Sequence, residues 1–237
     1  MKTFQQLLEG IYDPNIFKAV FLAGGPGSGK SFVVGRTVGG TGLKIINSDD
    51  PFERYLKKAG LSMRMPDSEK VPRDVERKRA KKVTAARKGH ALDGRLGLVI
   101  DGTGKEYAKL TGQANQLKEL GYEVYMVFVN TSLETALARN QNRARSVPPK
   151  IAEQGWKDVQ ANLGKFQSFF SPANFFIVDN NDDQEDLMQM STKLITRAIK
   201  KPVNNPIAKA WIANELKKKN ATTLANLNTG GGGGYVK

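Results

Sequence analysis

Short apolar runs recur five times along the chain, and each is followed by glycine or polar residues. Such runs predict β-strands, and the first of them, which is mostly apolar, is expected at the centre of a sheet. The predicted strands are residues 17–23 (FKAVFLA), 43–47 (LKIIN), 95–101 (RLGLVID), 122–130 (YEVYMVFVN) and 174–180 (NFFIVDN).

Helical patterns separate these strands. One helix is predicted to begin near Gly29. The others are predicted over residues 49–60, 73–92, 105–121, 132–145, 151–170 and 183–201. Ser132 is a plausible N-cap, and the prolines and polar residues of 63–72 predict a loop. Because strands and helices alternate, the sequence predicts an α/β fold with a parallel sheet and helices on both faces.

The ends of the chain differ from this alternating part. Residues 2–12 have apolar side chains on one helical face, so we expect residues 1–16 to hold an N-terminal amphipathic helix. Residues 17–201 form the main domain in this interpretation, and residues 202–237 form a basic C-terminal tail. Within that tail, residues 207–219 fit one more helix, and we expect the glycine-rich end to be mobile.

Composition excludes several classes of protein. The chain has 237 residues, 39% hydrophobic and 25% charged, as in ordinary soluble domains. Cysteine is absent, which excludes disulfides, thiolate catalysis and Cys-bound zinc, and His90 is the only histidine. We expect no membrane contact and a cytoplasmic location, because no run is long enough to span a bilayer and no signal-peptide core is present at the N-terminus.

Positive charge is concentrated in two segments. The formal net charge is +14, and residues 54–95 alone hold fourteen Lys and Arg against five Asp and Glu. Residues 193–220 hold eight against Glu215 alone. Each segment by itself fits a solvated helix face, whereas the two together favour a polyanion, such as a nucleic acid, as partner.

The segment GGPGSGKS, residues 24–31, matches the phosphate-binding pattern Gly-x4-Gly-Lys-Ser between a predicted strand and a predicted helix. Glycines let the backbone N–H groups surround a phosphate, and the helix that follows directs its positive end toward the same group. In such a loop Lys30 bridges the β- and γ-phosphates and Ser31 supplies a hydroxyl to Mg²⁺. The residues expected to bind the nucleotide are Gly25, Pro26, Gly27, Ser28, Gly29, Lys30 and Ser31.

Carboxylates follow two of the strands. Asp49 and Asp50 come after the second, and Asp101 ends the third, so all three are expected in the crevice at the carboxyl ends of the strands. One carboxylate there can accept the proton of an attacking hydroxyl. Asp101 can hold the Mg²⁺ shell or orient the acceptor. The alternatives are that Asp49 only caps the next helix and that Asp101 only forms a turn.

Arginines are grouped between the fourth strand and the proline pair at 148–149: Arg139, Arg143 and Arg145. Arg139 and Arg143 are four residues apart and share a helix face. A mobile segment with such arginines can close over a triphosphate and neutralise charge in the transition state. The alternative is a set of solvated surface arginines.

Taken together, these residues resemble the kinase module of bacteriophage polynucleotide 5′-hydroxyl kinases. They also resemble related small P-loop kinases, including zeta-toxin-like kinases and phage enzymes that phosphorylate hydroxymethylated pyrimidines in DNA. The shared motifs are PGSGKS at 26–31, N-x-DD at 47–50, the aspartate at 101, RN-x-x-R at 139–143 and VP at 147–148. The resemblance spans residues 17–180.

The resemblance implies a P-loop kinase fold of about five parallel strands, with ATP and Mg²⁺ as cofactors. It implies Asp49 as general base, Lys30 and Ser31 as phosphate and Mg²⁺ ligands, and Arg143 with Arg139 as lid arginines. Asp50, Arg54 and Arg145 are candidates for acceptor binding. The family's arginine shortly after the aspartate pair is not matched in place, because Phe52 and Glu53 stand there and Arg54 comes later.

Three functions are open at this point. The first is a kinase of nucleic acid, acting on a 5′-hydroxyl end or on a hydroxymethyl group of a base, with the basic segments along the phosphate backbone. The second is a kinase of a nucleotide or nucleotide sugar. The third is a nucleotide-binding assembly protein without catalysis.

Overall fold

The computed structural model describes residues 10–142, 147–181 and 185–229. Five parallel strands form one sheet in the order β2-β3-β1-β4-β5. Their bounds are β1 Lys18–Ala23, β2 Lys44–Ile46, β3 Leu98–Asp101, β4 Glu123–Asn130 and β5 Phe175–Asp179. All five predicted strands and the central place of the first are therefore confirmed.

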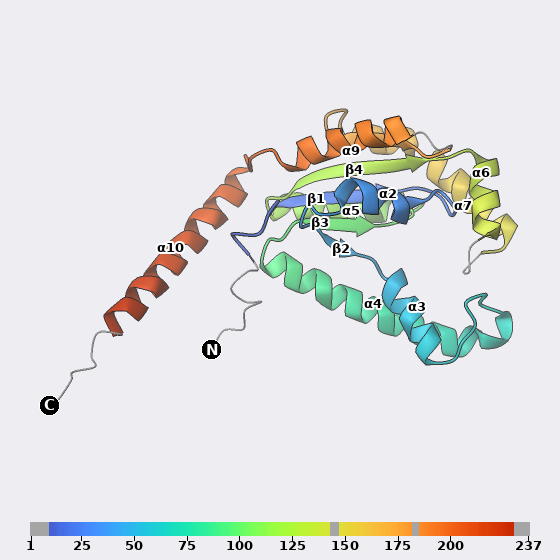
Figure 1. Ribbon diagram of the computed structural model, residues 1–237, viewed down its shortest axis with the longest axis horizontal. Helices are drawn as coiled ribbons and strands as arrows, with labels where there is room; N and C mark the ends of the chain where they lie inside the picture. The colour runs from blue at the N-terminus through green and yellow to red at the C-terminus, as the bar shows by residue number, and fades with distance from the viewer. Residues whose placement is uncertain (1–9, 143–146, 182–184, 230–237) are drawn as a thin grey trace.

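Both faces of the sheet are covered by helices (Figure 1). Val20 and Leu22 of β1 join a core cluster with residues of α2 (Lys30–Val38) and α9 (Glu185–Ile199). Phe21 belongs to the opposite cluster, with residues of α5 (Tyr107–Glu119) and α8 (Leu163–Phe170). Because successive strand residues point to opposite faces, one apolar run contributes to both cores.

Two helices and a short 3₁₀ turn form a projection that we call the helical arm, residues 49–93. It consists of α3 (Asp49–Lys58), η1 (Asp67–Glu69) and α4 (Lys70–Asp93). Phe52, Leu56 and Ala80 form a small apolar cluster between α3 and α4, separate from the two clusters on the sheet. Figure 1 shows the arm below the sheet, with its tip at η1.

The arm's second helix starts earlier than the sequence predicts. The pattern predicts a loop over 63–72, whereas α4 begins at Lys70 and includes Pro72. Proline is tolerated there because the first-turn N–H groups of a helix have no partner within the helix.

The predicted helix 151–170 is divided in two, α7 (Pro149–Gln160) and α8. At the break, the Asn162 side chain donates hydrogen bonds to the carbonyls of Gly104 and Lys105, at 3.1 and 2.9 Å. These bonds attach the break to the loop after β3. The predicted helix before β5 is therefore interrupted at a side chain that contacts a distant segment.

The last helix is longer than expected. Instead of ending at 219, α10 runs over Pro206–Thr229 and extends away from the sheet (Figure 1). Its first turns pack on the core, where Trp211 contacts the ring of Phe17 edge-on at 5.4 Å. Packing of those turns supplies the nucleus from which a helix can extend. The predicted helix 2–12 lies outside the described residues apart from 10–12, and the final glycine-rich segment lies wholly outside them.

None of the helices in the described part of the chain has the length and apolar character required to cross a bilayer.

Candidate active site

The loop between β1 and α2, residues 24–29, has a backbone that only glycine fits at two positions. Gly27 and Gly29 both have φ +81°, where side chains are strained. A Cβ at Gly27 would lie 2.0 Å from the carbonyl oxygen of Ala136, and one at Gly29 would lie 2.3 Å from Nδ2 of Asn180. Backbone angle and available space therefore both require glycine.

Neighbouring elements hold this loop from outside. Nδ2 of Asn180, after β5, donates to the Ser28 carbonyl over 2.8 Å in a buried hydrogen bond. Trp156 of α7 lies against Gly25, where a Cβ would be 3.2 Å from the Trp156 Cα, and its indole N–H donates to the Thr131 carbonyl over 2.9 Å. Sequence patterns do not indicate this role of Asn180, because its partner is 152 residues away.

A cavity of about 240 Å³ opens above the loop at the carboxyl ends of the strands. It is lined by Gly25, Gly27, Ser28, Gly29, Lys30, Ser31, Asn47, Ser48, Asp49, Asp101, Gly102 and Thr103. The structure thus brings the phosphate-binding loop together with the two carboxylates predicted from the ends of the second and third strands. Pro26 is not in the lining; it faces Gly155 of α7, where a Cβ would lie 3.3 Å from the proline ring.

Lys30 and Ser31 are the first residues of α2, so they stand at the positive end of its dipole. The Lys30 ammonium donates to the Gly24 carbonyl over 2.7 Å and lies 3.4 Å from the Gly25 carbonyl. This places its charge within the loop itself. A phosphate bound by the loop would find a cation and the N–H groups of a helix N-terminus at the same point.

Ser31 and Asp101 line the same cavity, and their oxygen atoms are the kind of ligand that Mg²⁺ requires. Among the described residues, no group of three or more His, Cys, Asp or Glu could hold a metal ion alone. Mg²⁺ in nucleotide sites takes only one or two protein ligands and fills its shell with phosphate oxygens and water. The hydroxyl and the carboxylate therefore fit a Mg²⁺ that arrives with a nucleotide.

Asn47 connects the two carboxylates. Its Nδ2 donates to Asp101 over 3.0 Å, and its Oδ1 accepts a hydrogen bond from the Asp49 N–H over 2.7 Å. Ser48, rather than Asp49, occupies the N-cap position of α3, and Asp49 is the first residue of the helix. The sequence motif contains Asn47, but its spacing alone does not show this connecting role.

Asp49 has a partner that the sequence does not identify. Arg77 of α4 donates to its Oδ1 over 2.9 Å, with both side chains partly exposed.

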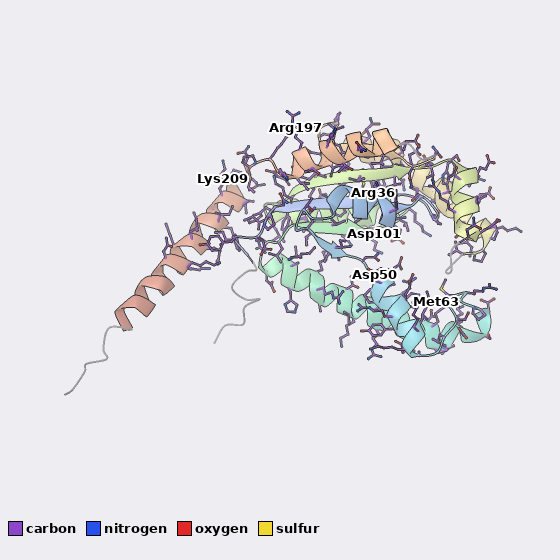
Figure 2. All side chains as sticks on the ribbon, viewed as in Figure 1. Arg36, Asp50, Met63, Asp101, Arg197 and Lys209 are labelled. Atoms are coloured by element: carbon purple, nitrogen blue, oxygen red, sulfur yellow. The ribbon has the colours of Figure 1, made fainter. Side chains whose placement is uncertain are left out.

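The candidate acceptor residues Asp50 and Arg54 are not brought into the cavity. Both are exposed on α3, and neither is part of the lining. Successive helix residues point about 100° apart, so Asp50 is directed away from the wall that contains Asp49. Figure 2 labels Asp50 on α3 of the arm and Asp101 at the sheet above it.

Arg139 lies at the end of α6 (Leu133–Gln141), a helix whose predicted N-cap is confirmed because Ser132 Oγ accepts from the Thr135 N–H. The Arg139 guanidinium donates to the carbonyls of Asn180 and Asn181, at 2.5 and 3.2 Å. A Cβ at Gly29 would lie 3.9 Å from it. It thus stands beside the phosphate-binding loop, on the β5 side.

The second lid arginine, Arg143, and the candidate acceptor residue Arg145 lie outside the described residues. The segment that contains them is bounded by a pair of hydrogen bonds between Asn140 and Val147. The Asn140 amide donates to the Val147 carbonyl over 2.8 Å and accepts from its N–H over 3.2 Å. Asn140 is buried, so this pair fixes the positions of Asn140 and Val147 relative to each other.

Comparison with solved structures supports the fold. A putative kinase from Chloroflexus aurantiacus J-10-fl superposes with a TM-score of 0.54 at 14% identity, covering 78% of this chain and 98% of that chain. The AvrRxo1-ORF1:-ORF2 complex with ATP gives a TM-score of 0.52 at 16% identity, covering 70% of this chain and only 55% of that chain. No curated protein sequence matches the chain.

A protein-family model matches the chain over most of its length. The model described as an AAA domain matches residues 20–166, which is more than half of the 237 residues. The match begins within β1 and ends within α8, so it includes the phosphate-binding loop, Asp49, Asp101 and Arg139. The chain belongs to this family of P-loop AAA domains, and its fold is that of P-loop kinases.

Proposed function

We propose that the chain is a kinase that transfers the γ-phosphate of ATP to a hydroxyl group on a nucleic acid. The observation that carries this proposal is the shared cavity, in which the loop residues Lys30 and Ser31 face the carboxylates Asp49 and Asp101. A nucleotide-binding protein needs only the loop. A carboxylate supplied by a second strand adds a proton acceptor beside the terminal phosphate.

In the proposed step, the acceptor oxygen attacks the γ-phosphorus, the bond from that phosphorus to the β–γ bridging oxygen breaks, and ADP leaves with the electron pair. The hydroxyl proton passes to the carboxylate of Asp49. Lys30 and the loop N–H groups hold the phosphates, and Arg139 with Arg143 would complete the positive surroundings. Bound Mg²⁺, held by Ser31 and Asp101, would neutralise phosphate charge.

The helical arm supports a nucleic-acid acceptor. Among the 24 residues of α4 only Ala80 and Ala91 are buried. We call its outward Lys78, Lys81 and Lys82 the basic face; all three are exposed, and their i, i+3 and i+4 spacing puts them on one side of the helix. Because α4 also contacts Asp49 through Arg77, this positive surface belongs to the element that borders the site.

A small-molecule acceptor is the second candidate, and a second cavity favours it. This cavity of about 180 Å³ shares Asp101, Gly102 and Thr103 with the first. Its other polar residues are Glu106, Lys109 and Gln113. A nucleotide or nucleotide sugar would find hydrogen-bonding groups there without using the basic face.

The deciding experiment is an acceptor screen with [γ-³²P]ATP. The acceptors are 5′-hydroxyl oligonucleotides, hydroxymethyluracil-containing DNA, nucleosides and nucleotide sugars. Label on an oligonucleotide, with turnover that falls steeply as salt rises, supports the nucleic-acid kinase; label confined to small molecules supports the second candidate. Asp49→Asn should lower transfer to a small residual rate while ATP still binds. If no acceptor is labelled and Asp49→Asn changes nothing, the chain is a nucleotide-binding assembly protein instead.

A further inference from the structure

Arg77 is held in one orientation by two different contacts. One N–H of its guanidinium donates to Oδ1 of Asp49 over 2.9 Å, and the Cζ atom of the same group lies over the Phe52 ring, 3.9 Å from the ring centre. Phe52 is only 1% exposed and cannot move without disturbing the cluster between α3 and α4. Stacking fixes the plane of the guanidinium, and the hydrogen bond fixes its direction.

The helix that contains Arg77 is attached to the same segment at a second point. Two helical turns further along α4, the Thr84 hydroxyl lies 3.3 Å from the carbonyl oxygen of Asn47 and shares its one proton between this oxygen and the Ala80 carbonyl, at 2.9 Å. Ala80, between them on the same face, is fully buried in the arm's cluster. One face of α4 therefore lies along residues 47–52, the segment that contains Asp49.

We propose that Arg77, supplied by α4, is a positioning residue for Asp49; this inference rests on the proposed function. Arginine stays protonated at any ordinary pH, so it cannot take the hydroxyl proton itself. Its charge-assisted hydrogen bond holds the carboxylate in one orientation and opposes rotation of the side chain. Arg77 thereby makes the placement of the general base depend on how α4 lies against the β2 end of the sheet.

A matched control lies two residues further along the helix. Arg79 also stacks on an aromatic ring of α3, at 4.6 Å from the centre of Tyr55, and it pairs with Glu76 of its own helix at 3.8 Å. No contact between Arg79 and Asp49 is found, and its side chain is 64% exposed. Arg77→Met and Arg79→Met remove the same charge from the same helix, and only Arg77→Met removes the interaction with Asp49.

The test compares kcat and KM of the full chain and these variants with ATP and the acceptor found in the screen. Arg77→Met should lower kcat about ten- to hundredfold, the size expected when a catalytic group is misplaced, and leave the KM for ATP unchanged. Arg79→Met should keep kcat within about twofold. Arg77→Lys should recover part of kcat, because it keeps a cation on a similar aliphatic chain. If Arg77→Met does not fold, Arg77→Lys is used for the test instead. A wild-type kcat for Arg77→Lys would then count against the proposal.

An Asp49→Asn background separates positioning from other roles. If Arg77 acts through Asp49, adding Arg77→Met to Asp49→Asn lowers the residual kcat no further. A further loss, an equal effect of Arg79→Met, or a rise in acceptor KM with kcat unchanged would overturn the positioning role. If the wild-type chain transfers phosphate to no acceptor, the proposed function fails and this inference with it. Transfer by wild type and Arg77→Met at equal kcat overturns this inference alone.

Discussion

The side chain of Asn47 donates a hydrogen bond to Asp101 over 3.0 Å and so joins the carboxyl ends of β2 and β3. The same side chain accepts a hydrogen bond from the N–H of Asp49 over 2.7 Å. One amide therefore sets the relative positions of the candidate general base and the candidate metal ligand. The two carboxylates come from sequence positions 52 residues apart, and Asn47 is what makes them parts of one site.

Replacing this amide tests its connecting role. Asn47→Ala removes both hydrogen bonds, and we expect transfer to fall about tenfold while stability falls by about 1–2 kcal/mol. Steady-state kinetics and urea unfolding measure the two effects separately. Asn115 of α5, exposed on the outer surface, is the matched control, and Asn115→Ala should change neither. Wild-type kinetics for Asn47→Ala would show that β2 and β3 hold the carboxylates without its help.

Replacing Gly27 or Gly35 by alanine should have different effects on ATP affinity and stability. Gly27→Ala puts a Cβ 2.0 Å from the Ala136 carbonyl at φ +81°, so the loop must distort, and ATP affinity should fall at least about tenfold. Gly35, within α2, has nothing within 4 Å of an added Cβ. Gly35→Ala should leave ATP binding unchanged and raise stability by about 0.5–1 kcal/mol. Calorimetric titration with ATP and thermal unfolding check both; equal ATP affinity of the two variants would contradict the role of Gly27.

The alternation of strands and helices could be read from the sequence because apolar periodicity is a local property. The shared position of Asp49 and Asp101 could also be predicted, because the carboxyl ends of parallel strands meet at one edge of the sheet. The break of the helix at Asn162 could not be predicted, since it depends on carbonyls of Gly104 and Lys105 in another part of the chain.

The partner of Asp49 could not be predicted for the same physical reason. Arg77 is 28 residues away, in a helix whose many basic residues look alike in sequence. Only the packing of Ala80 against α3 shows which face of α4 is directed toward the site. Arg139 is predicted near the phosphates, but its bonds to the carbonyls after β5 follow from strand order, which the local pattern does not contain.

A pH-dependent part of the stability comes from the opposite edge of the sheet. Burial alone would raise the pKa of Glu123, but hydrogen bonds from Lys18, the Asn204 N–H and Tyr125, together with the Lys18 charge, outweigh it and hold this pKa below its ordinary value. A carboxyl whose pKa is lowered by folding stabilises the fold above its unfolded pKa. That contribution is lost as pH falls through the folded pKa.

Glu123→Gln tests this. Lys18 is 1% exposed, and without the carboxylate its charge is buried unpaired, so the variant should lose about 3 kcal/mol at pH 7. Between pH 7 and pH 3 the wild type should lose more stability than the variant does. Urea unfolding across that range measures the difference. Identical pH profiles would mean that Glu123 has the same pKa in the folded and unfolded chain.

We expect the basic face of α4 to contribute to the binding of a short oligonucleotide acceptor, and the end of α10 not to contribute. The first turns of α10 pack against Phe17 and Gly121, which precede β1 and β4, so α10 leaves from the amino edge of the sheet. The candidate site lies at the carboxyl edge. Figure 1 shows α4 running below the sheet and α10 extending away from it.

We therefore compare two triple variants with the same loss of charge. Changing Lys78, Lys81 and Lys82 to Gln should raise the KM for a short 5′-hydroxyl oligonucleotide and reduce the slope of log KM against log salt by up to about 2–3, because each lysine that neutralises a phosphate contributes roughly one to that slope. The KM for ATP should not change. Changing Lys217, Lys218 and Lys219 to Gln should leave the KM for the short oligonucleotide within about twofold, because α10 leaves from the far edge. An equal rise in both variants would mean that overall charge, rather than the basic face, attracts the acceptor.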